Sequence, residues 1–485
     1  MSATFPPGFL WGAGAAAYQV EGAAREDGRL PSIWDTFSHT PGKTLHGDTG
    51  DVATDHYHRL EEDLDLMARL GLGAYRFSIS WPRVQPEGRG RPNPAGLDFY
   101  RRLLEGLARR SIRAAATLYH WDLPQVLQDR GGWPARDTAE RFGEYAALMA
   151  RELGDGVALW TTLNEPYCSA WLGYGTGAHA PGLRDSGQAL AATHHLLLGH
   201  ARALAAVRSE RPGAPVGISL NLATVRSASE APADRAAVER LDGLQNRLFC
   251  EPLFEGRYPE AVVELFSGLR PGLVTAPGDL EAISAPVDFL GLNYYGPTWV
   301  QAANEPDPRV SGEDGHGLWV PELRLRPYRD PEWRTTAMGW PVDPQGLVQL
   351  LTEIHRRRWA PAVYVTENGA AFHDYVDPEG RVQDPERISY LASHLEAVAG
   401  AIARGVPVRG YFVWSLTDNF EWAWGYSRRF GLVFVEYGTQ RRIPKTSFEW
   451  YRRVIATNAV PPAAGEVFEP GTPGRPRRPG RRSSG

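Results

Sequence analysis

The sequence of 485 residues has little cysteine, little excess charge and no long apolar run, and each shortage excludes a class of protein. Its two cysteines, Cys168 and Cys250, are too few for the disulfide framework of a small secreted domain. A net charge of −5 does not favour a nucleic acid or an anionic membrane surface as a partner. No stretch of 18 or more apolar residues exists that could cross a bilayer.

The first residues, MSATFPPGFLWG, contain neither a basic n-region nor a sustained apolar h-region. We therefore expect no signal peptide and a cytoplasmic location. In a reducing compartment both cysteines are expected to be free, buried thiols.

Short apolar runs alternate with amphipathic segments along almost the whole chain. This alternation indicates parallel strands that are buried on both faces and separated by helices. Strands are expected at residues 9–17, 73–80, 112–119, 157–164, 215–222, 287–295, 362–367 and 408–415. Helices are expected at residues 54–70, 97–110, 137–153, 186–210, 234–252, 345–358 and 385–404.

Eight such strands predict an α/β fold with a single closed (β/α)8 TIM barrel, whose catalytic domain spans residues 1–460. In that fold the active site lies at the carboxyl ends of the strands, where long βα loops form a pocket. Residues 299–340 are rich in Pro, Trp and charge without clear periodicity, and we expect them to form a long loop over the barrel mouth. Residues 461–485, rich in Pro, Gly and Arg, are expected to form a disordered, solvated tail.

Two of the expected strands end in a glutamate. VALWTTLNEPYC (157–168) places Glu165 after an apolar run, and APAVYVTENGAAF (360–372) places Glu367 in the same way. Pro166 stiffens the first turn, and Gly369 is free to take a positive φ in the second. Because the carboxyl ends of barrel strands meet at one face, these side chains are predicted to be paired carboxylates that face one cavity.

Paired carboxylates can hydrolyse glycosides, bind a divalent metal, or abstract and return protons. A metal would need further ligands at nearby strand ends, where only His120 is found, so we expect no metal and no cofactor. The His56/His58 and His194/His195 pairs fall in helix-like segments and are expected to be structural.

Tryptophan is abundant, with 16 residues in the chain. Flat rings beside amides and carboxylates favour a carbohydrate, because rings stack on the C–H face of a sugar while polar groups bind its hydroxyls. Tryptophans near the expected strand ends are Trp121, Trp133, Trp160, Trp171, Trp340, Trp414, Trp422 and Trp424.

Several motifs occur in a fixed order over residues 5–455: YRFSISWPRVQPEG, TLYHWDLPQ, TLNEPYC, GLNYY, YVTENG, WSLTDNFEWAWGY and RFGL. With them the chain resembles glycoside hydrolase family 1, the β-glucosidase family. The resemblance implies a retaining, exo-acting β-glucosidase that removes terminal β-glucosyl residues, and also β-galactosyl or β-fucosyl residues, from cello-oligosaccharides or from aryl and alkyl glucosides. Its only implied partner is this small-molecule substrate, and cellulose degradation is the implied context.

The resemblance also assigns roles to residues. Glu165 would be the acid/base and Glu367 the nucleophile, with their carboxyl groups roughly 5–5.5 Å apart. The charge of Glu367, together with partial burial, should raise the pKa of Glu165. Arg76 and Tyr295 would hold the nucleophile, with Asn293 nearby. Trp414 would lie beneath the sugar ring and Trp340 would flank the leaving group; the other substrate-binding positions are Gln19, His120, Trp121, Asn164, Glu421 and Trp422.

Three alternatives to a simple hydrolase stay open. A transglycosylase would keep both glutamates and pass the sugar to an alcohol instead of water. A 6-phospho-β-glucosidase would carry a Ser and a Lys after the glycone-reading segment, where this chain has Glu421 and Trp422, although Ser427-Arg428-Arg429 supplies positive charge just downstream. A silent sugar-binding barrel would have lost one glutamate, and both are present.

Overall fold

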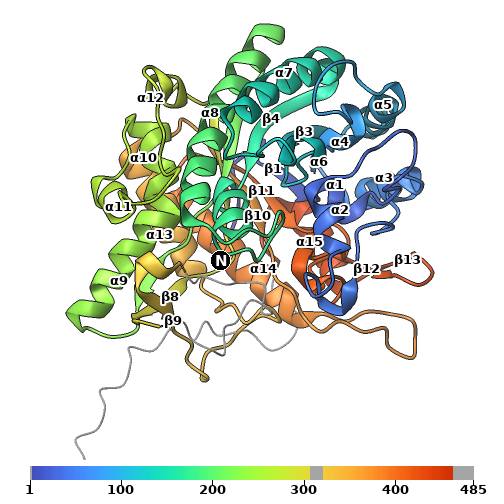
Figure 1. Cartoon of the computed structure of the whole chain (residues 1–485). Helices are drawn as coiled ribbons and strands as arrows, with labels where there is room; N and C mark the ends of the chain where they lie inside the picture. Colours follow the sequence, from blue (N-terminus) through green and yellow to red (C-terminus); the bar gives the residue numbers. More distant parts are fainter. Residues whose placement is uncertain (1–2, 306–319, 462–485) are drawn as a thin grey trace, which may run out of the picture.

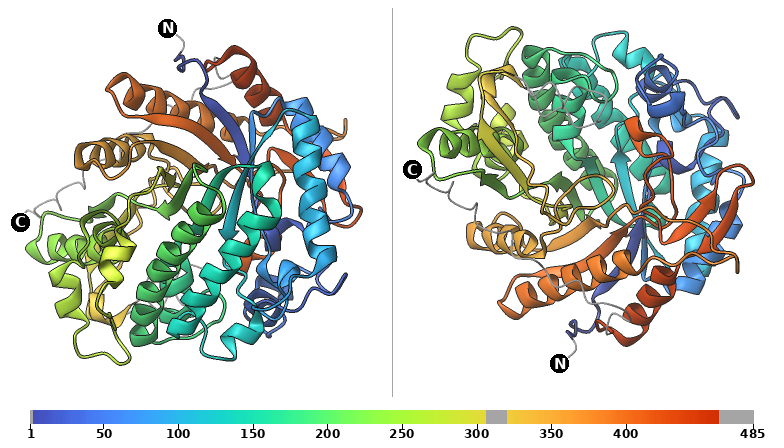
Figure 2. Two further views of the ribbon diagram at one scale, coloured as in Figure 1. Left: turned by 90° about the horizontal axis from the view of Figure 1, so that it is seen from above. Right: turned by 90° about the horizontal axis from the view of Figure 1, so that it is seen from below.

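Eight parallel strands close into a barrel at the centre of the computed structural model, which describes residues 3–305 and 320–461. The strand order around the barrel is β1-β11-β10-β7-β5-β4-β3-β2, so the predicted TIM barrel is confirmed. In Figure 2 the strands lie at the centre and the helices surround them. The barrel strands are β1 (Leu10–Gly14), β2 (Ala74–Ser78), β3 (Arg113–Tyr119), β4 (Val157–Asn164), β5 (Val216–Asn221), β7 (Phe289–Asn293), β10 (Val363–Asn368) and β11 (Val408–Trp414).

Long helices form the outer layer (Figure 1). Most bury one face against the barrel or a neighbouring helix, whereas α8 is buried all round from Ala189 to Ala201. The helix predicted at 186–210 is α8 (Ser186–Glu210), with the expected bounds. The last helix, α15, was not predicted from the apolar pattern. The other long helices are α3 (Leu60–Leu70), α5 (Pro94–Arg109), α7 (Arg136–Leu153), α13 (Pro344–Arg357), α14 (Pro385–Ala403) and α15 (Thr446–Thr457).

Two helix predictions are wrong in part. Residues 54–59 are turns rather than the start of α3, because the amides of Thr54 and His56 both donate to the carbonyl of Val20 and Asp55 adopts a φ of 54°. The helix expected at 234–252 is divided into α9 (Pro232–Asp242), a π-helical turn η4 (Gly243–Arg247) and α10 (Leu248–Glu255).

The segment predicted as a loop at 299–340 contains strands. β8 (Thr298–Ala302) pairs in parallel with β6 (Val225–Ser227) and in antiparallel with β9 (Leu325–Pro327), which makes a three-stranded sheet. This sheet lies at the lower end of the molecule in Figure 1. Residues 306–319 of the expected loop, and residues 462–485 of the expected tail, lie outside the described residues.

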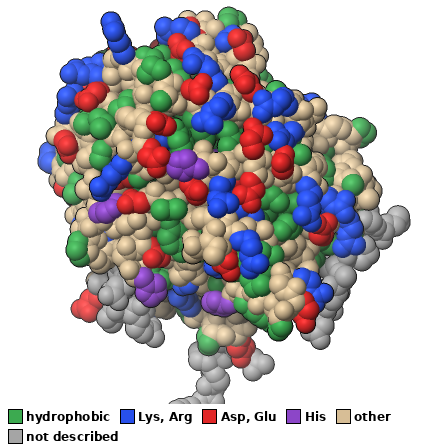
Figure 3. All heavy atoms as spheres, turned by 90° about the vertical axis from the view of Figure 1, so that its right-hand side faces the viewer, with side chains coloured by type: hydrophobic (Ala, Val, Ile, Leu, Met, Phe, Trp, Pro, Cys, Tyr) green, Lys and Arg blue, Asp and Glu red, His purple; other side chains and the backbone are tan. Residues whose placement is uncertain are grey.

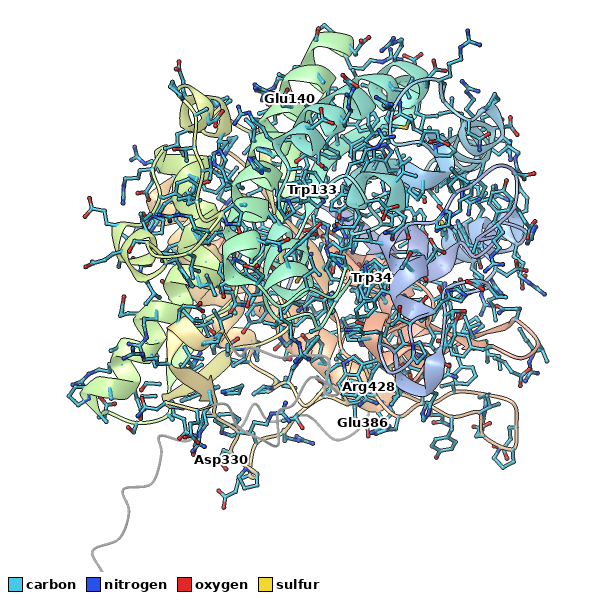
Figure 4. The ribbon with its side chains drawn as sticks, in the orientation of Figure 1. Trp34, Trp133, Glu140, Asp330, Glu386 and Arg428 are labelled. Atoms are coloured by element: carbon cyan, nitrogen blue, oxygen red, sulfur yellow. The ribbon has the colours of Figure 1, made fainter. Side chains whose placement is uncertain are left out.

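Three tryptophans that the sequence placed near the strand ends belong to the core instead. Trp133, Trp160 and Trp171 are fully buried, and Trp133 packs edge-on against Tyr119 with 5.1 Å between ring centroids. Their burial reflects the space between the barrel and its helices, which large rings fill. Figure 4 labels Trp133 within the ribbon, away from the lower end of the barrel.

A buried ion cluster fastens the segment after β11. Lys445, one of two lysines in the sequence, is buried with its Nζ 2.6 Å from Asp374 and 2.7 Å from Asp418. Arg387 on α14 binds Asp374 at 2.7 Å and also binds Asp384. Pairing is required because an isolated charge is very costly to bury. The cluster thereby holds the residues that follow β11 against α14 and the start of α15.

Charges of both signs are interspersed over the face shown in Figure 3, without an extended area of one sign. The helix α8 spans 25 residues, yet no helix in residues 3–305 and 320–461 is long and apolar enough to cross a membrane. Cys168 and Cys250 are free and buried, as predicted.

Candidate active site

A cavity of about 520 Å³ opens at the carboxyl ends of the barrel strands, a size typical of small-molecule sites. Its floor is formed by buried residues that include Glu165 and Glu367. Its outer wall is formed by half-exposed aromatic side chains from β8, the residues after β9, and the turn before α13. We call these residues the outer wall: Trp299, Tyr328, Trp333 and Trp340.

Glu165 follows directly after β4. Its φ of 47° ends the strand, and Pro166 then begins a helical turn, so the side chain is directed into the cavity. The Asn293 amide donates to Oε1 at 2.7 Å, and the Cys168 thiol donates to Oε2 at 3.2 Å. Burial, followed by the nearby charge of Glu367, raises the pKa of Glu165 to about 8. The carboxyl group is therefore mostly protonated at neutral pH, which is the direction expected from the sequence.

Glu367 lies near the end of β10 and has a different environment. Arg76 on β2 donates from Nη1 to Oε1 at 2.5 Å, and the Tyr295 hydroxyl donates to Oε2 at 2.6 Å. A buried guanidinium and a phenolic donor both favour the charged form of a carboxyl group. Two carboxyl groups with different hydrogen-bond partners therefore face one cavity.

Hydrogen bonds connect the two carboxyl groups. The Asn164 Oδ1 accepts from Arg76 Nη2 at 2.6 Å and from Asn293 Nδ2 at 2.9 Å, and Asn293 in turn binds Glu165. Asn293 also stands opposite Glu367 in the register of β7 and β10. The structure thus brings together the residues that the sequence assigned to the reaction centre.

Gly369 is required for a reason other than the predicted one. It is not among the residues with positive φ. Instead, a Cβ at this position would lie 1.8 Å from the carbonyl oxygen of Trp414, well inside van der Waals contact. The glycine therefore lets the turn after Glu367 pass close to the end of β11.

His120 is neutral and its tautomer is fixed. Because Asn164 uses its oxygen to accept from Arg76 and Asn293, its Nδ2 donates to His120 Nε2 at 3.0 Å. The proton of His120 is therefore on Nδ1, which is buried and has no hydrogen-bond partner among the residues that the structure describes. Burial, then the charge of Arg76, holds the pKa of His120 well below its usual value. His120 can thus offer an N–H donor to a ligand.

Gln19 and Glu421 lie together beside the floor. The Gln19 Nε2 donates to the Phe420 carbonyl at 2.9 Å and to Glu421 Oε2 at 3.5 Å. Gln19 Oε1 is buried without a partner in the described part of the chain. Burial, then the charges of Glu367 and Glu165, raises the pKa of Glu421 to about 8. Glu421 lines the cavity, so its carboxyl group can bind hydroxyl groups, whereas Gln19 is fully buried beside it and is not among the lining residues.

The predicted aromatic residues surround these polar groups. Trp121 and Trp422 contact each other with ring centroids 4.4 Å apart, and both take positive φ values, 81° and 51°. Such backbone strain in non-glycine residues is concentrated at functional sites. Trp414 stacks on His120 at 5.9 Å, and Trp340 lies against Tyr295 at 5.3 Å.

Several cavity residues were not predicted from the sequence. Asn221 ends β5, so the rule that selected the two glutamates could have found it. Cys168, expected from the sequence to be a buried thiol, also lines the cavity. Further aromatic residues of the cavity carry no local signal: Trp299 on β8, and His179, Tyr328 and Trp333 on loops.

The two arginines downstream of Glu421, Arg428 and Arg429, contact other groups of the protein. Arg429 donates to Asp418 at 2.6 Å, and Arg428 lies over the ring of Trp424 at 4.1 Å. Figure 4 shows Arg428 and Asp330 at the end of the molecule where β8 and β9 lie. The described residues hold no group of three or more His, Cys, Asp or Glu that could bind a metal ion.

A (β/α)8 barrel with two carboxyl groups in different environments in one aromatic-lined cavity is typical of glycoside-cleaving barrel enzymes. The chain belongs to glycosyl hydrolase family 1, whose profile matches residues 1–460.

Individual relatives match this chain over most or all of their length. The chain is 50% identical to a thermostable β-glucosidase B of Thermobispora bispora, covering 94% of this chain and 92% of the relative. It is 47% identical to a bifunctional β-D-glucosidase/β-D-fucosidase of Bifidobacterium breve, covering 95% of this chain and 100% of the relative. A family 1 β-glucosidase structure from Thermotoga maritima superposes with a TM-score of 0.88 at 44% identity, covering 95% and 100% of the two chains. Another structure of that enzyme holds deoxynojirimycin, at a TM-score of 0.87 and 45% identity, covering 94% and 99% of the two chains.

Proposed function

We propose that this chain is a retaining, exo-acting β-glucosidase that removes terminal β-glucosyl residues from short oligosaccharides and aryl glucosides. The observation that carries the proposal is the difference between its two carboxyl groups: Glu165 is held neutral by burial, whereas Glu367 is bound by Arg76 and Tyr295. β-Fucosyl and β-galactosyl residues are further substrates in this proposal, in keeping with the bifunctional relative.

In the first step Glu367 attacks the anomeric carbon while Glu165 gives its proton to the departing oxygen. A covalent glycosyl ester on Glu367 results, and the negative charge on that side chain is lost. Since that charge helps to raise the pKa of Glu165, the pKa falls at this point. Glu165 can then act as a base, activating the water that hydrolyses the ester. Its two roles thus follow from the charge of its neighbour.

The other cavity residues fit the binding of a terminal sugar. His120 and Glu421 offer a donor and a carboxyl group for hydroxyls, and Trp414 offers a ring face. In this proposal Gln19, which is buried beside Glu421, adds an acceptor. In this proposal Asn164, Trp121 and Trp422 complete the glycone site. Trp340 and the rest of the outer wall bind the leaving group in this proposal, since they line the cavity and are partly exposed, unlike the buried floor. We further propose a cytoplasmic location, because both cysteines are free thiols.

Hydrolysis of nitrophenyl β-glucoside tests the proposal. Glu367→Gly should abolish turnover, because the nucleophile is lost. Glu165→Ala should retain activity on substrates with good leaving groups, which need no proton, and should gain rate with added azide while forming the β-azide. Glu386→Ala removes an exposed carboxylate in α14 (Figure 4) and should leave the rate unchanged.

Two outcomes would contradict the proposal. A β-azide formed by the Glu367 variant would mean that the two glutamates have exchanged roles. NMR during hydrolysis shows the anomeric configuration of the released sugar. An inverted configuration would mean that no covalent intermediate forms. Product analysis with an added alcohol distinguishes hydrolysis from transglycosylation.

A further inference from the structure

We propose that Cys168 is a positioning residue for Glu165, and that its thiol, oriented by Asn221, sets the pH range in which Glu165 can donate a proton. This inference rests on the proposed role of Glu165. Cys168 itself has no part in the mechanism described above, so the inference goes beyond that mechanism.

The thiol contacts Glu165 because of the local backbone. Cys168 is the third residue after Glu165, and its amide donates to the Glu165 carbonyl at 2.9 Å, which closes the turn between β4 and the π-helix η3 (Cys168–Gly175). Residues three apart on such a turn lie on the same face. The Cys168 Sγ is accordingly 3.2 Å from Glu165 Oε2.

The direction of donation is defined by Asn221. This amide, at the end of β5, donates to the Cys168 sulfur at 3.4 Å, so the sulfur accepts from Asn221 while its own proton is directed to Glu165. Burial and the neighbouring glutamates raise the pKa of Cys168 well above its usual value, so the thiol keeps this proton. Asn221 stands opposite Asn293 in the register of β5 and β7. One oxygen of Glu165 is therefore bound by Asn293 directly, and the other is linked to Asn221 through sulfur.

A thiol has an advantage at this position because it donates weakly. A donor to a carboxylate favours the charged form and lowers its pKa. Asn293 already gives Glu165 one strong donor, and a second strong donor would keep the group ionised at neutral pH, when it should carry a proton. The thiol orients Oε2 and lowers the pKa of Glu165 less than a stronger donor at this position would.

The other ionisable groups around Glu165 come from four further parts of the barrel. Arg76 lies on β2, Tyr295 follows β7, Glu367 lies on β10 and Glu421 follows β11. None of the four residues is altered by a substitution at position 168. A shift in the titration of Glu165 then reports on the thiol.

The test measures the pH dependence of kcat/KM with a poor leaving group, such as phenyl β-glucoside, for which proton donation limits the rate. The basic limb of this profile reports the pKa of the acid in the free enzyme. Cys168→Val fills the space without a donor. We expect the basic limb of its profile of kcat/KM against pH to move to higher pH by about half a unit or more. Cys168→Ser keeps a donor that is stronger than a thiol, so its limb should stay at or below the wild-type position.

Cys250→Ser is the matched control, since Cys250 is fully buried in α10 and does not line the cavity; its limb should not move. Unfolding temperatures check that each variant is folded, and Cys168→Ala replaces the valine variant if the larger side chain disturbs packing. The proposal is overturned if the limb of Cys168→Val stays in place or moves down, if Cys168→Ser moves up equally, or if Cys250→Ser shifts by the same amount. An inactive wild-type protein would instead refute the proposed function.

Discussion

At the scale of single residues, the two glutamates differ in their hydrogen-bond partners, and burial raises the pKa of Glu165. Glu165 has only neutral donors within hydrogen-bonding distance, whereas Glu367 is bound by a guanidinium and a phenol. Two carboxyl groups of the same residue type in one cavity therefore suit different roles, one as proton donor and the other as nucleophile. Each of these contacts can be tested by removing one donor.

Tyr295→Phe removes only the hydroxyl that binds Glu367 at 2.6 Å. We expect kcat/KM for nitrophenyl β-glucoside to fall by about 10- to 100-fold, because a hydrogen bond to a charged group contributes about 1.5–3 kcal/mol. Tyr375→Phe makes the same chemical change at a tyrosine that is 72% exposed, and it should leave kcat/KM unchanged. Equal rates for the two variants would show that the hydroxyl does not hold the nucleophile.

At the scale of secondary-structure elements, the site depends on how closely neighbouring strand ends approach one another. The turn that follows Glu367 on β10 passes so close to Trp414 on β11 that only glycine fits at position 369. The geometry of the nucleophile therefore depends on a backbone contact as well as on hydrogen bonds.

Gly369→Ala should lower the free energy of unfolding by about 1–3 kcal/mol or more, because the new Cβ would lie 1.8 Å from the Trp414 oxygen and the backbone would have to move. Gly400→Ala is the matched control on α14, where an added Cβ meets nothing within 4 Å. The control should be neutral or stabilising by up to about 1 kcal/mol, since alanine is the better helix former. Denaturant unfolding measures both variants. Equal stability of the two would contradict the close approach.

The barrel strands could be predicted because each is an apolar run whose burial depends little on its partners. The elements that were missed depend on distant residues. β9 is a three-residue strand that exists through its pairing with β8, and residues 54–59 leave the helical pattern because their amides donate to Val20. Such long-range hydrogen bonds leave no periodic signal in the sequence.

In the candidate site, too, residues with a local sequence signal could be predicted, whereas contacts that depend on the fold could not. Glu165 and Glu367 were found because each carboxyl group ends an apolar run. The contact between Cys168 and Glu165 could not be predicted, since it depends on the backbone of the turn after β4. The number of tryptophans indicated a carbohydrate, but not which of them line the cavity, because core and cavity tryptophans occur in similar sequence surroundings.

At the scale of the whole molecule, the interior contains several carboxyl groups whose pKa values burial has raised. Besides Glu165 and Glu421, Asp122 is fully buried after β3, and burial raises its pKa to about 8. A group with a raised pKa binds its proton more tightly in the folded than in the unfolded state. Its contribution to stability is therefore present at low pH and is lost as the pH rises.

Asp122→Asn should make stability less dependent on pH. In the wild type the contribution of Asp122 is lost between its unfolded pKa, about 3.9, and its folded pKa, about 8. An asparagine does not titrate, so the unfolding temperature of the variant should fall less between pH 5 and pH 8 than that of the wild type. Asp137→Asn, on the exposed first turn of α7, should leave the wild-type slope intact. Parallel slopes for Asp122→Asn and the wild type would contradict the raised pKa.

The ion cluster around Lys445 has a practical consequence for chemical labelling. The sequence has only two lysines, and Lys445 is enclosed by Asp374 and Asp418. Lys43, which is partly exposed beside Phe37, is then the single side-chain amine that an acylating reagent can reach in the folded protein. Acylation of side-chain amines should therefore be confined to Lys43 in the folded protein, which peptide mapping of the labelled protein can check.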